Sequence, residues 1–183
     1  MSPYRAALDE LSAVVEHIDD KAVDGACDMI AAARHITLYA CGREGLQLRG
    51  FCMRLFHMGL EVAMVGDVTT PAIGAGDLFI DCAGPGFVST SEPLMNIARS
   101  AGARVLFITA RPDAPLARLA DFTLLVPAQT MADDQSSGAS RVLPMGSAME
   151  GALFILFEVM IYKLKERLGV TAEAMRGRHT NME

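Results

Sequence analysis

The sequence predicts an α/β fold in which a parallel β-sheet carries helices on both faces. Short apolar segments of high β-propensity alternate along the 183 residues with longer segments of helical periodicity. Two of the short segments, ending at Cys41 and Ala83, run directly into glycine-rich turns that precede helical patterns. The order of strand, glycine turn and helix is how an α/β protein presents backbone N–H groups and a helix N-terminus to a small ligand.

The N-terminal segment, residues 4–33, is predicted to be helical with a break near Asp19. Its apolar residues fall on one face and its acidic residues on the other. Residues 36–41 form the first predicted strand. Their weak alternation indicates a strand that is buried on both faces.

A helical pattern follows the first glycine turn, Gly42–Gly45, and runs to about His57. Residues 60–65 and 77–83 are the second and third predicted strands, because each is a short apolar run between turn signals. The third strand enters Gly84-Pro85-Gly86, which is the second glycine turn.

The remaining elements follow the same two periodicities. Ser89, Thr90 and Ser91 offer hydroxyls to cap the next helix, which closes at Gly102. The long helix 147–168 is apolar on most faces, as in helices buried in a core or between subunits. The other predicted elements are strands at 104–108 and 122–126, a short helix at 114–119, a polar surface loop at 128–142 and a tail at 171–183.

Five strands alternating with helices predict a parallel sheet with right-handed crossovers. A flavodoxin-like strand order, 2-1-3-4-5, makes this sheet the centre of a three-layer sandwich, and the chain reverses direction between strands one and three. The two glycine turns follow these two strands, so we expect both turns beside one cleft. For either turn alone, a tight connection without a ligand explains the glycines equally well.

Composition excludes several classes of protein. Apolar residues make up 51% and charged residues 21%, which with the length indicates one globular domain over residues 1–183. The net charge of −6 argues against a nucleic-acid partner. The four cysteines show no metal-ligand spacing, which predicts reduced thiols in the cytoplasm and no metal site. No signal core is present, and the longest apolar run is too short to span a membrane.

Few residues qualify as catalytic from their spacing alone. The first turn does not match GxGxxG and no P-loop occurs, which disfavours a dinucleotide or P-loop site. Glu150 lies three residues after Ser147, and this spacing also suits a capping box, a purely structural role. His179 lies in a polar tail, where a solvated surface histidine is the alternative to a functional one.

Several short motifs occur in a fixed order over essentially the whole chain. They are Met53–Leu55, Gly66–Ile73, Gly76–Leu78, Pro112–Leu116, Leu143–Ser147 with Glu150, and Arg178–Glu183. With the two glycine turns, they resemble the pattern GxGxS, SGSGET, LPMGTxxE and RHxNLE of the SIS (sugar isomerase) domain family. Within that family the likeness is to the 6-phospho-3-hexuloisomerases.

The resemblance implies an isomerase without metal or organic cofactor that interconverts 3-keto and 2-keto hexose phosphates through an enediol(ate). It implies that Glu150 is the base and that His179 assists ring opening or proton shuttling. It also implies a cytoplasmic homo-oligomer, a dimer or a tetramer. The sugar or sugar phosphate is expected at the two turns, with the candidate binding residues Gly42, Arg43, Glu44, Gly86, Ser89, Thr90 and Ser91.

The chain departs from the family pattern in the phosphate-binding turns. Glu44 stands where the first turn has serine, and Ala83–Val88 stands where the second has SGSGET. Pro85 also lacks a backbone donor, and a carboxylate repels a phosphate. Arg43 is left either to pair with Glu44 or to bind an anion, together with the hydroxyls of Ser89–Ser91.

Three functions stay open at this point. The first is a divergent SIS-family isomerase acting on a sugar phosphate or on a sugar without phosphate. The second is a non-catalytic module that binds a carbohydrate derivative, and the third is a structural oligomer with a vestigial cleft.

Overall fold

The computed structural model describes residues 1–136 and 138–182. Its strands are β1 (Ile36–Ala40), β2 (Val62–Met64), β3 (Leu78–Cys82), β4 (Arg104–Thr109) and β5 (Phe122–Leu125). All pairs are parallel, in the order β2-β1-β3-β4-β5. The predicted topology is therefore confirmed, and the chain reverses direction between the neighbouring strands β1 and β3.

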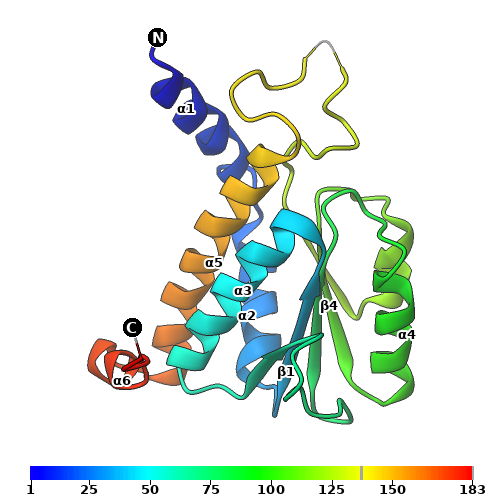
Figure 1. The fold of residues 1–183 in the computed structure, drawn as a ribbon, viewed down its shortest axis with the longest axis vertical. Coiled ribbons are helices and arrows are strands. Elements are labelled where there is room, and N and C mark those ends of the chain that lie inside the picture. The colour runs from blue at the N-terminus through cyan, green and yellow to red at the C-terminus, as the bar shows by residue number, and fades with distance from the viewer. Residues whose placement is uncertain (137, 183) are drawn as a thin grey trace.

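Helices cover both faces of this sheet (Figure 1). They are α1 (Pro3–Val15), α2 (Asp20–Ala31), α3 (Gly42–His57), α4 (Ser91–Ser100), the 3-10 helix η1 (Pro115–Leu119), α5 (Ser147–Leu168) and α6 (Ala172–Gly177). α2, α3 and α5 lie on one side of the sheet, and α4 and η1 lie on the other. The predicted break near Asp19 is confirmed, because its side chain caps α2. The segment predicted as a tail contains the short helix α6.

Two hydrophobic clusters hold these layers together. The larger joins α2, α3 and α5 to one face of the sheet, and within it the rings of Phe51 and Phe157 stack with centroids 4.4 Å apart. The smaller joins α4 and η1 to the other face. α5, predicted to be buried, is buried along one side only, since Phe154 and Tyr162 are 61% and 65% exposed. Among the described residues, no helix has the length and apolar character needed to cross a bilayer.

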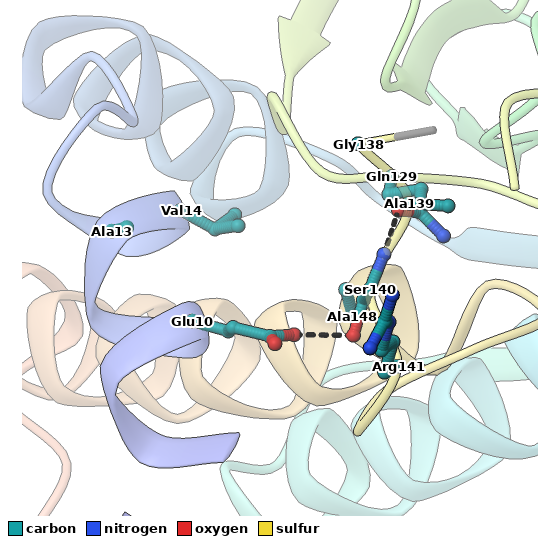
Figure 2. A pocket seen from close by; sticks show the side chains of 9 residues that line it. All are labelled: Glu10, Ala13, Val14, Gln129, Gly138, Ala139, Ser140, Arg141 and Ala148. Atoms are coloured by element: carbon teal, nitrogen blue, oxygen red, sulfur yellow. Dashed lines mark hydrogen bonds between the residues drawn. The ribbon is translucent and has the colours of Figure 1, made fainter. Parts of the chain in front are cut away.

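The polar segment 128–142 lies beside α1. Figure 2 shows Glu10 of α1 pointing at Ser140, whose hydroxyl donates a hydrogen bond to the Glu10 carboxylate. The backbone N–H of Ser140 donates to Gln129 Oε1 at 2.8 Å. Thr130 and Ala128 at the start of the segment are buried. Burial near Ala128 and the hydrogen bond of Ser140 therefore attach both ends of the segment 128–142 to the rest of the protein.

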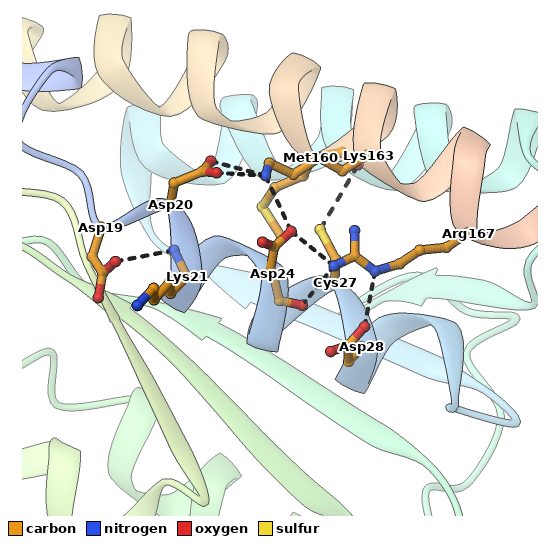
Figure 3. A network of polar contacts seen from close by, with 9 residues as sticks. All are labelled: Asp19, Asp20, Lys21, Asp24, Cys27, Asp28, Met160, Lys163 and Arg167. Atoms are coloured by element: carbon orange, nitrogen blue, oxygen red, sulfur yellow. Dashed lines mark hydrogen bonds and ion pairs between the residues drawn. The ribbon is translucent and has the colours of Figure 1, made fainter.

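An ion-pair network joins α2 to α5 (Figure 3). Lys163 Nζ lies 2.9 Å from Asp20 and 3.1 Å from Asp24, and Arg167 lies 2.8 Å from both Asp24 and Asp28. The three acids recur every four residues, so they share one face of α2. Hydrogen bonds from Arg167 and then Lys163 hold the pKa of Asp24 below its usual range.

We expect the Asp24→Asn variant to lose less stability than wild type when the pH is lowered. Because the folded-state pKa of Asp24 lies below its unfolded value, its ion pairs stabilise the fold above the unfolded pKa, and this contribution disappears as the pH falls through the folded pKa. The difference in Tm between wild type and Asp24→Asn should therefore be larger near neutral pH than in acid. Thermal unfolding across this range measures it, with Asp134→Asn as control, because the half-buried Asp134 forms no ion pair with the described residues. Equal Tm differences at both ends of the range would contradict the expectation.

Candidate active site

The first glycine turn is the opening turn of α3. β1 ends at Ala40, and Gly42 enters the helix with a φ of +57°, a left-handed conformation that glycine adopts without steric cost. A Cβ at Gly45 would lie 2.7 Å from the Ala40 carbonyl oxygen. Glycine therefore allows the N-terminus of α3 to pack directly onto the carboxyl end of β1, and this places Arg43 and Glu44 at the switch point.

Glu44 reaches from the first glycine turn to the second. Its Oε2 accepts hydrogen bonds from the backbone N–H of Gly84 at 2.9 Å and from the thiol of Cys82 at 3.4 Å. A Cβ at Gly84 would lie 2.6 Å from Glu44 Oε1, so a larger residue there would displace the carboxylate. The two turns face each other, and the predicted shared cleft is confirmed.

A second buried acid lies near Glu44. Burial raises the pKa of Glu44, although the Gly84 and Cys82 hydrogen bonds oppose the rise. Burial also raises the pKa of Asp81 in β3 to about 7, against a hydrogen bond from the Ser91 hydroxyl and with a further increase from the Glu44 charge. Asp81 Oδ2 has no hydrogen-bond partner among the described residues. Asp81 was not singled out from the sequence, although an acid within an apolar strand was an available signal.

Arg43 contacts the start of α5. Its guanidinium donates to Ser147 Oγ at 3.1 Å and to the Met145 carbonyl oxygen, and it lies 3.1 Å from Glu150 Oε2. Met145 itself has a φ of +56°, a left-handed conformation that is rare for residues other than glycine. The suggested pairing of Arg43 with Glu44 is wrong, because the two neighbouring side chains leave α3 in different directions and meet different partners.

Glu150 does not have the capping role that its spacing allows. The N-cap of α5 is Gly146, in the left-handed conformation, and no side chain makes a capping hydrogen bond. The Glu150 side chain is 15% exposed and pairs with Arg43. Burial raises the pKa of Glu150, the positive charge of Arg43 opposes this, and the negative charge of Glu44 adds to it. A carboxyl group with a raised pKa is a candidate general base.

The hydroxyls after the second turn are turned largely to protein partners. Thr90 occupies the N-cap position of α4, but its side chain makes no capping hydrogen bond, so the predicted capping is wrong. Its Oγ1 instead accepts a hydrogen bond from the Tyr39 hydroxyl at 2.6 Å. Ser91 is buried and donates to the acid of β3. Gly86 is buried and donates its N–H within its own turn. Ser89 is exposed.

His179 follows α6, which lies beyond the C-terminal end of α5, whereas Glu150 lies in the first turn of α5 (Figure 1). The ring centroid of His179 is 5.2 Å from that of His57, and its Nδ1 is 3.1 Å from the Thr180 carbonyl oxygen. The 22 residues of α5 span about 33 Å. One chain therefore does not bring these two predicted catalytic residues together.

A cavity of about 330 Å³ lies over the two turns. Its walls include the ionisable side chains of Arg43, Glu44 and Glu150, together with Met131 from the segment 128–142 and Met145. Its size falls within the range of roughly 300–1,000 Å³ that is usual for small-molecule sites. The contribution of Met131 means that the polar segment forms part of the wall.

A larger cavity of about 500 Å³ lies between α1 and the segment 128–142 (Figure 2). Of its polar side chains, Glu10, Gln129 and Ser140 bind one another or the backbone, and Arg141 also lines the cavity. It is not bordered by either glycine turn. We therefore assign the candidate active site to the smaller cavity, which contains the convergent acids and Arg43.

The residues around the smaller cavity do not form an evident metal site. Among residues 1–136 and 138–182, no group of three or more His, Cys, Asp or Glu side chains is placed to hold a metal ion. The four cysteines, all within these ranges, are free thiols.

Comparison with known proteins supports the family resemblance that the motifs indicate. No family model matches the chain. The chain is 37% identical over 184 residues to the 3-hexulose-6-phosphate isomerase of Methylomonas aminofaciens, with 100% of both chains covered.

Solved structures share the fold. A hypothetical protein of Methanococcus jannaschii, for which a 3-hexulose-6-phosphate isomerase function is inferred, has a TM-score of 0.84 at 26% identity, with 96% of this chain and 98% of that chain covered. The NanR protein of Vibrio vulnificus, complexed with ManNAc-6P, has a TM-score of 0.72 at 19% identity, with 96% and 64% covered, and this likeness shows the fold alone. Sequence identity over the full length and the shared topology lead to one conclusion: the chain belongs to the SIS domain family and is related to the 3-hexulose-6-phosphate isomerases.

Proposed function

We propose that the chain is a sugar or sugar-phosphate isomerase that moves a carbonyl group through an enediol(ate), with Glu150 as the base. The observation that carries the proposal is the position of Glu150, a carboxyl group of raised pKa on the wall of a sugar-sized cavity at the switch point. Its Oε2 pairs with Arg43, and its Oε1 accepts no hydrogen bond from the described residues. Oε1 is therefore available to take a proton from a bound sugar.

The residues around Glu150 suit this chemistry. Glu150 removes the proton from the carbon beside the carbonyl, and the electron pair of the broken C–H bond forms the enediolate double bond. Arg43, 3.1 Å from Glu150, is near enough to stabilise the negative oxygen of the enediolate. The hydroxyl proton on the neighbouring carbon passes to the former carbonyl oxygen, and the proton held by Glu150 returns to the former carbonyl carbon, so that the carbonyl moves by one position. The full-length similarity to a 3-hexulose-6-phosphate isomerase supports this reaction class.

A role for His179 requires a second subunit, and we include it in the proposal on that condition. Met53, Phe56, Phe154 and Tyr162 lie on α3 and α5 and are each more than half exposed. Apolar surface of this kind is typical of faces that bind another protein chain. A homo-oligomer, dimer or tetramer, formed in this way would give His179 of the partner subunit a route to the cleft.

One observation favours a second candidate, a non-catalytic module that binds a carbohydrate derivative. The ion pair with Arg43 stabilises the charged form of Glu150 and so makes it a weaker base. A sugar bound at this ion pair would be held without losing a proton.

Proton exchange separates the two candidates. We expect ketohexoses or their 6-phosphates, incubated with the protein in D₂O, to gain deuterium at the carbon beside the carbonyl, as detected by NMR or mass spectrometry. A sugar that raises the Tm but gains no deuterium would identify the non-catalytic module. If no member of the panel exchanges, the isomerase proposal is wrong for ketohexoses and their 6-phosphates.

A further inference from the structure

We propose that Glu44 is a built-in anion that fills the anion-binding position of the cleft, so that this end of the cleft takes an uncharged, polyhydroxylated sugar end and excludes a phosphate. The inference rests on the proposed function only for the statement that the ligand is a sugar. The exclusion of phosphate stands on the contacts of Glu44 and its neighbours.

Glu44 occupies a position suited to an anion. It lies in the first turn of α3, where the partial positive charge of the helix N-terminus favours negative groups. The N–H of Gly84 in the second turn points at the same place and donates to Glu44 Oε2 at 2.9 Å. A ligand phosphate would need this donor, and the protein's own carboxylate already has it.

The second glycine turn offers few hydrogen-bond donors, and the nearby cation, Arg43, is already ion-paired. Arg43 is committed to Ser147, the Met145 carbonyl and Glu150. Pro85 has no N–H, and the N–H of Gly86 donates within its turn. A phosphate in this cleft would meet two carboxylates, Glu44 and Glu150, against one guanidinium, and close like charges repel strongly outside bulk water.

Glu44 and Glu150 each keep one carboxylate oxygen for a ligand in the cleft. Both hydrogen bonds of Glu44 go to Oε2, so Oε1 accepts none from the described residues. Oε1 of Glu150 also accepts no hydrogen bond from the described residues, and Glu150 lines the same cavity. Carboxylate oxygens only accept hydrogen bonds, and sugar hydroxyls donate them. Two acceptor groups lining one cavity therefore match the hydroxyls of a sugar end that carries no charge.

Calorimetric titration with inorganic phosphate, fructose 6-phosphate and fructose tests the proposal. The proteins are wild type, Glu44→Ser, which removes the carboxylate and supplies a hydroxyl, and Glu44→Gln, which keeps an oxygen for the Gly84 N–H but has no charge. Glu92→Ser is the matched control. Glu92 also lies in the first turn of a helix, α4, but its carboxylate pairs with Arg118 at 3.3 Å.

We expect Glu44→Ser to bind inorganic phosphate and fructose 6-phosphate at least about tenfold more tightly than wild type, and Glu44→Gln to fall between them. Glu92→Ser should bind inorganic phosphate and fructose 6-phosphate as tightly as wild type does, although it changes the net charge by the same amount as Glu44→Ser. Wild type should not prefer fructose 6-phosphate to fructose. If Glu44→Ser does not fold, as judged by its Tm, the comparison of Glu44→Gln with wild type decides the matter.

Three results would overturn the proposal: equal phosphate binding by wild type and the Glu44 variants, phosphate binding by none of them, or an equal gain in Glu92→Ser. These titrations read binding and need no turnover. The proposed isomerase function fails in the deuterium-exchange assay, whereas this inference fails in the titration, so the two failures are distinguishable.

Discussion

Glu150→Gln should lower the rate of deuterium incorporation into the substrate by about 10²–10⁴-fold, the usual contribution of a general base. The amide has nearly the shape of the carboxylate but cannot accept the proton. The variant should keep its fold, because Glu150 lies at the wall of the cavity and its loss leaves Arg43 half exposed rather than buried. Rates of exchange and Tm values, measured on the same preparations, check both statements.

The same helix provides a matched control. Glu158 lies eight residues further along α5, and its carboxylate pairs with Arg54 at 3.0 Å, so Glu158→Gln removes a similar ion pair away from the cleft. Its exchange rate should equal that of wild type. A comparable loss in both variants, or undiminished exchange in Glu150→Gln, would remove Glu150 from the role of base.

The pH dependence of exchange follows from the environment of Glu150. The base must be ionised to act, so the rate falls as the pH falls through its pKa. Because burial raises this pKa, the acid limb of the rate profile should lie at higher pH than for an ordinary glutamate. Arg43→Gln removes the charge that opposes the rise, and should therefore move the acid limb to still higher pH.

Phe51→Ala should cost about 3–5 kcal/mol of the free energy of unfolding, which is the usual penalty for truncating a buried aromatic side chain. Phe51 is 1% exposed, and its ring stacks on Phe157 where α3 packs against α5. The same two helices carry Arg43 and Glu150. A domain of this size loses roughly 2–4 °C of Tm per kcal/mol, so the expected shift is readily measured by thermal unfolding.

Phe56→Ala is the control for this prediction. Phe56 lies on the same helix and is 53% exposed, so its truncation should change the free energy of unfolding by about 0.5 kcal/mol or less. A loss as large as that of Phe51→Ala would show that this face of α3 is covered in solution, since an exposed ring contributes little to a monomer.

The chain order of strands and helices was predictable because it depends on local patterns. Apolar runs such as 77–83 and 104–108 have the length of strands, and the break near Asp19 carries a residue that caps the following helix. The flavodoxin-like strand order, one of the common orders for such sheets, puts the two glycine turns at one switch point, and the structure has this order.

The partners of the charged residues were not predictable in this way. Spacing allowed Glu150 to cap its own helix, and Arg43 was open to pairing with Glu44 or to binding an anion. The structure shows neither the cap nor a pair between Arg43 and Glu44. Neighbours in sequence on a helix point in different directions, whereas the partners that each side chain meets come from other elements. Spacing also could not show that His179 lies far from Glu150, since that separation depends on the direction in which α5 crosses the molecule.

The sequence by itself determined the α/β topology, the family and the cleft, because hydrophobic periodicity, glycine turns and motif order are local properties of the chain. Only the tertiary structure decided that Glu44 bonds the Gly84 N–H and that Arg43 bonds Glu150. These pairs join residues forty or more positions apart, and their chemistry depends on burial, which exists only once the helices have packed onto the sheet.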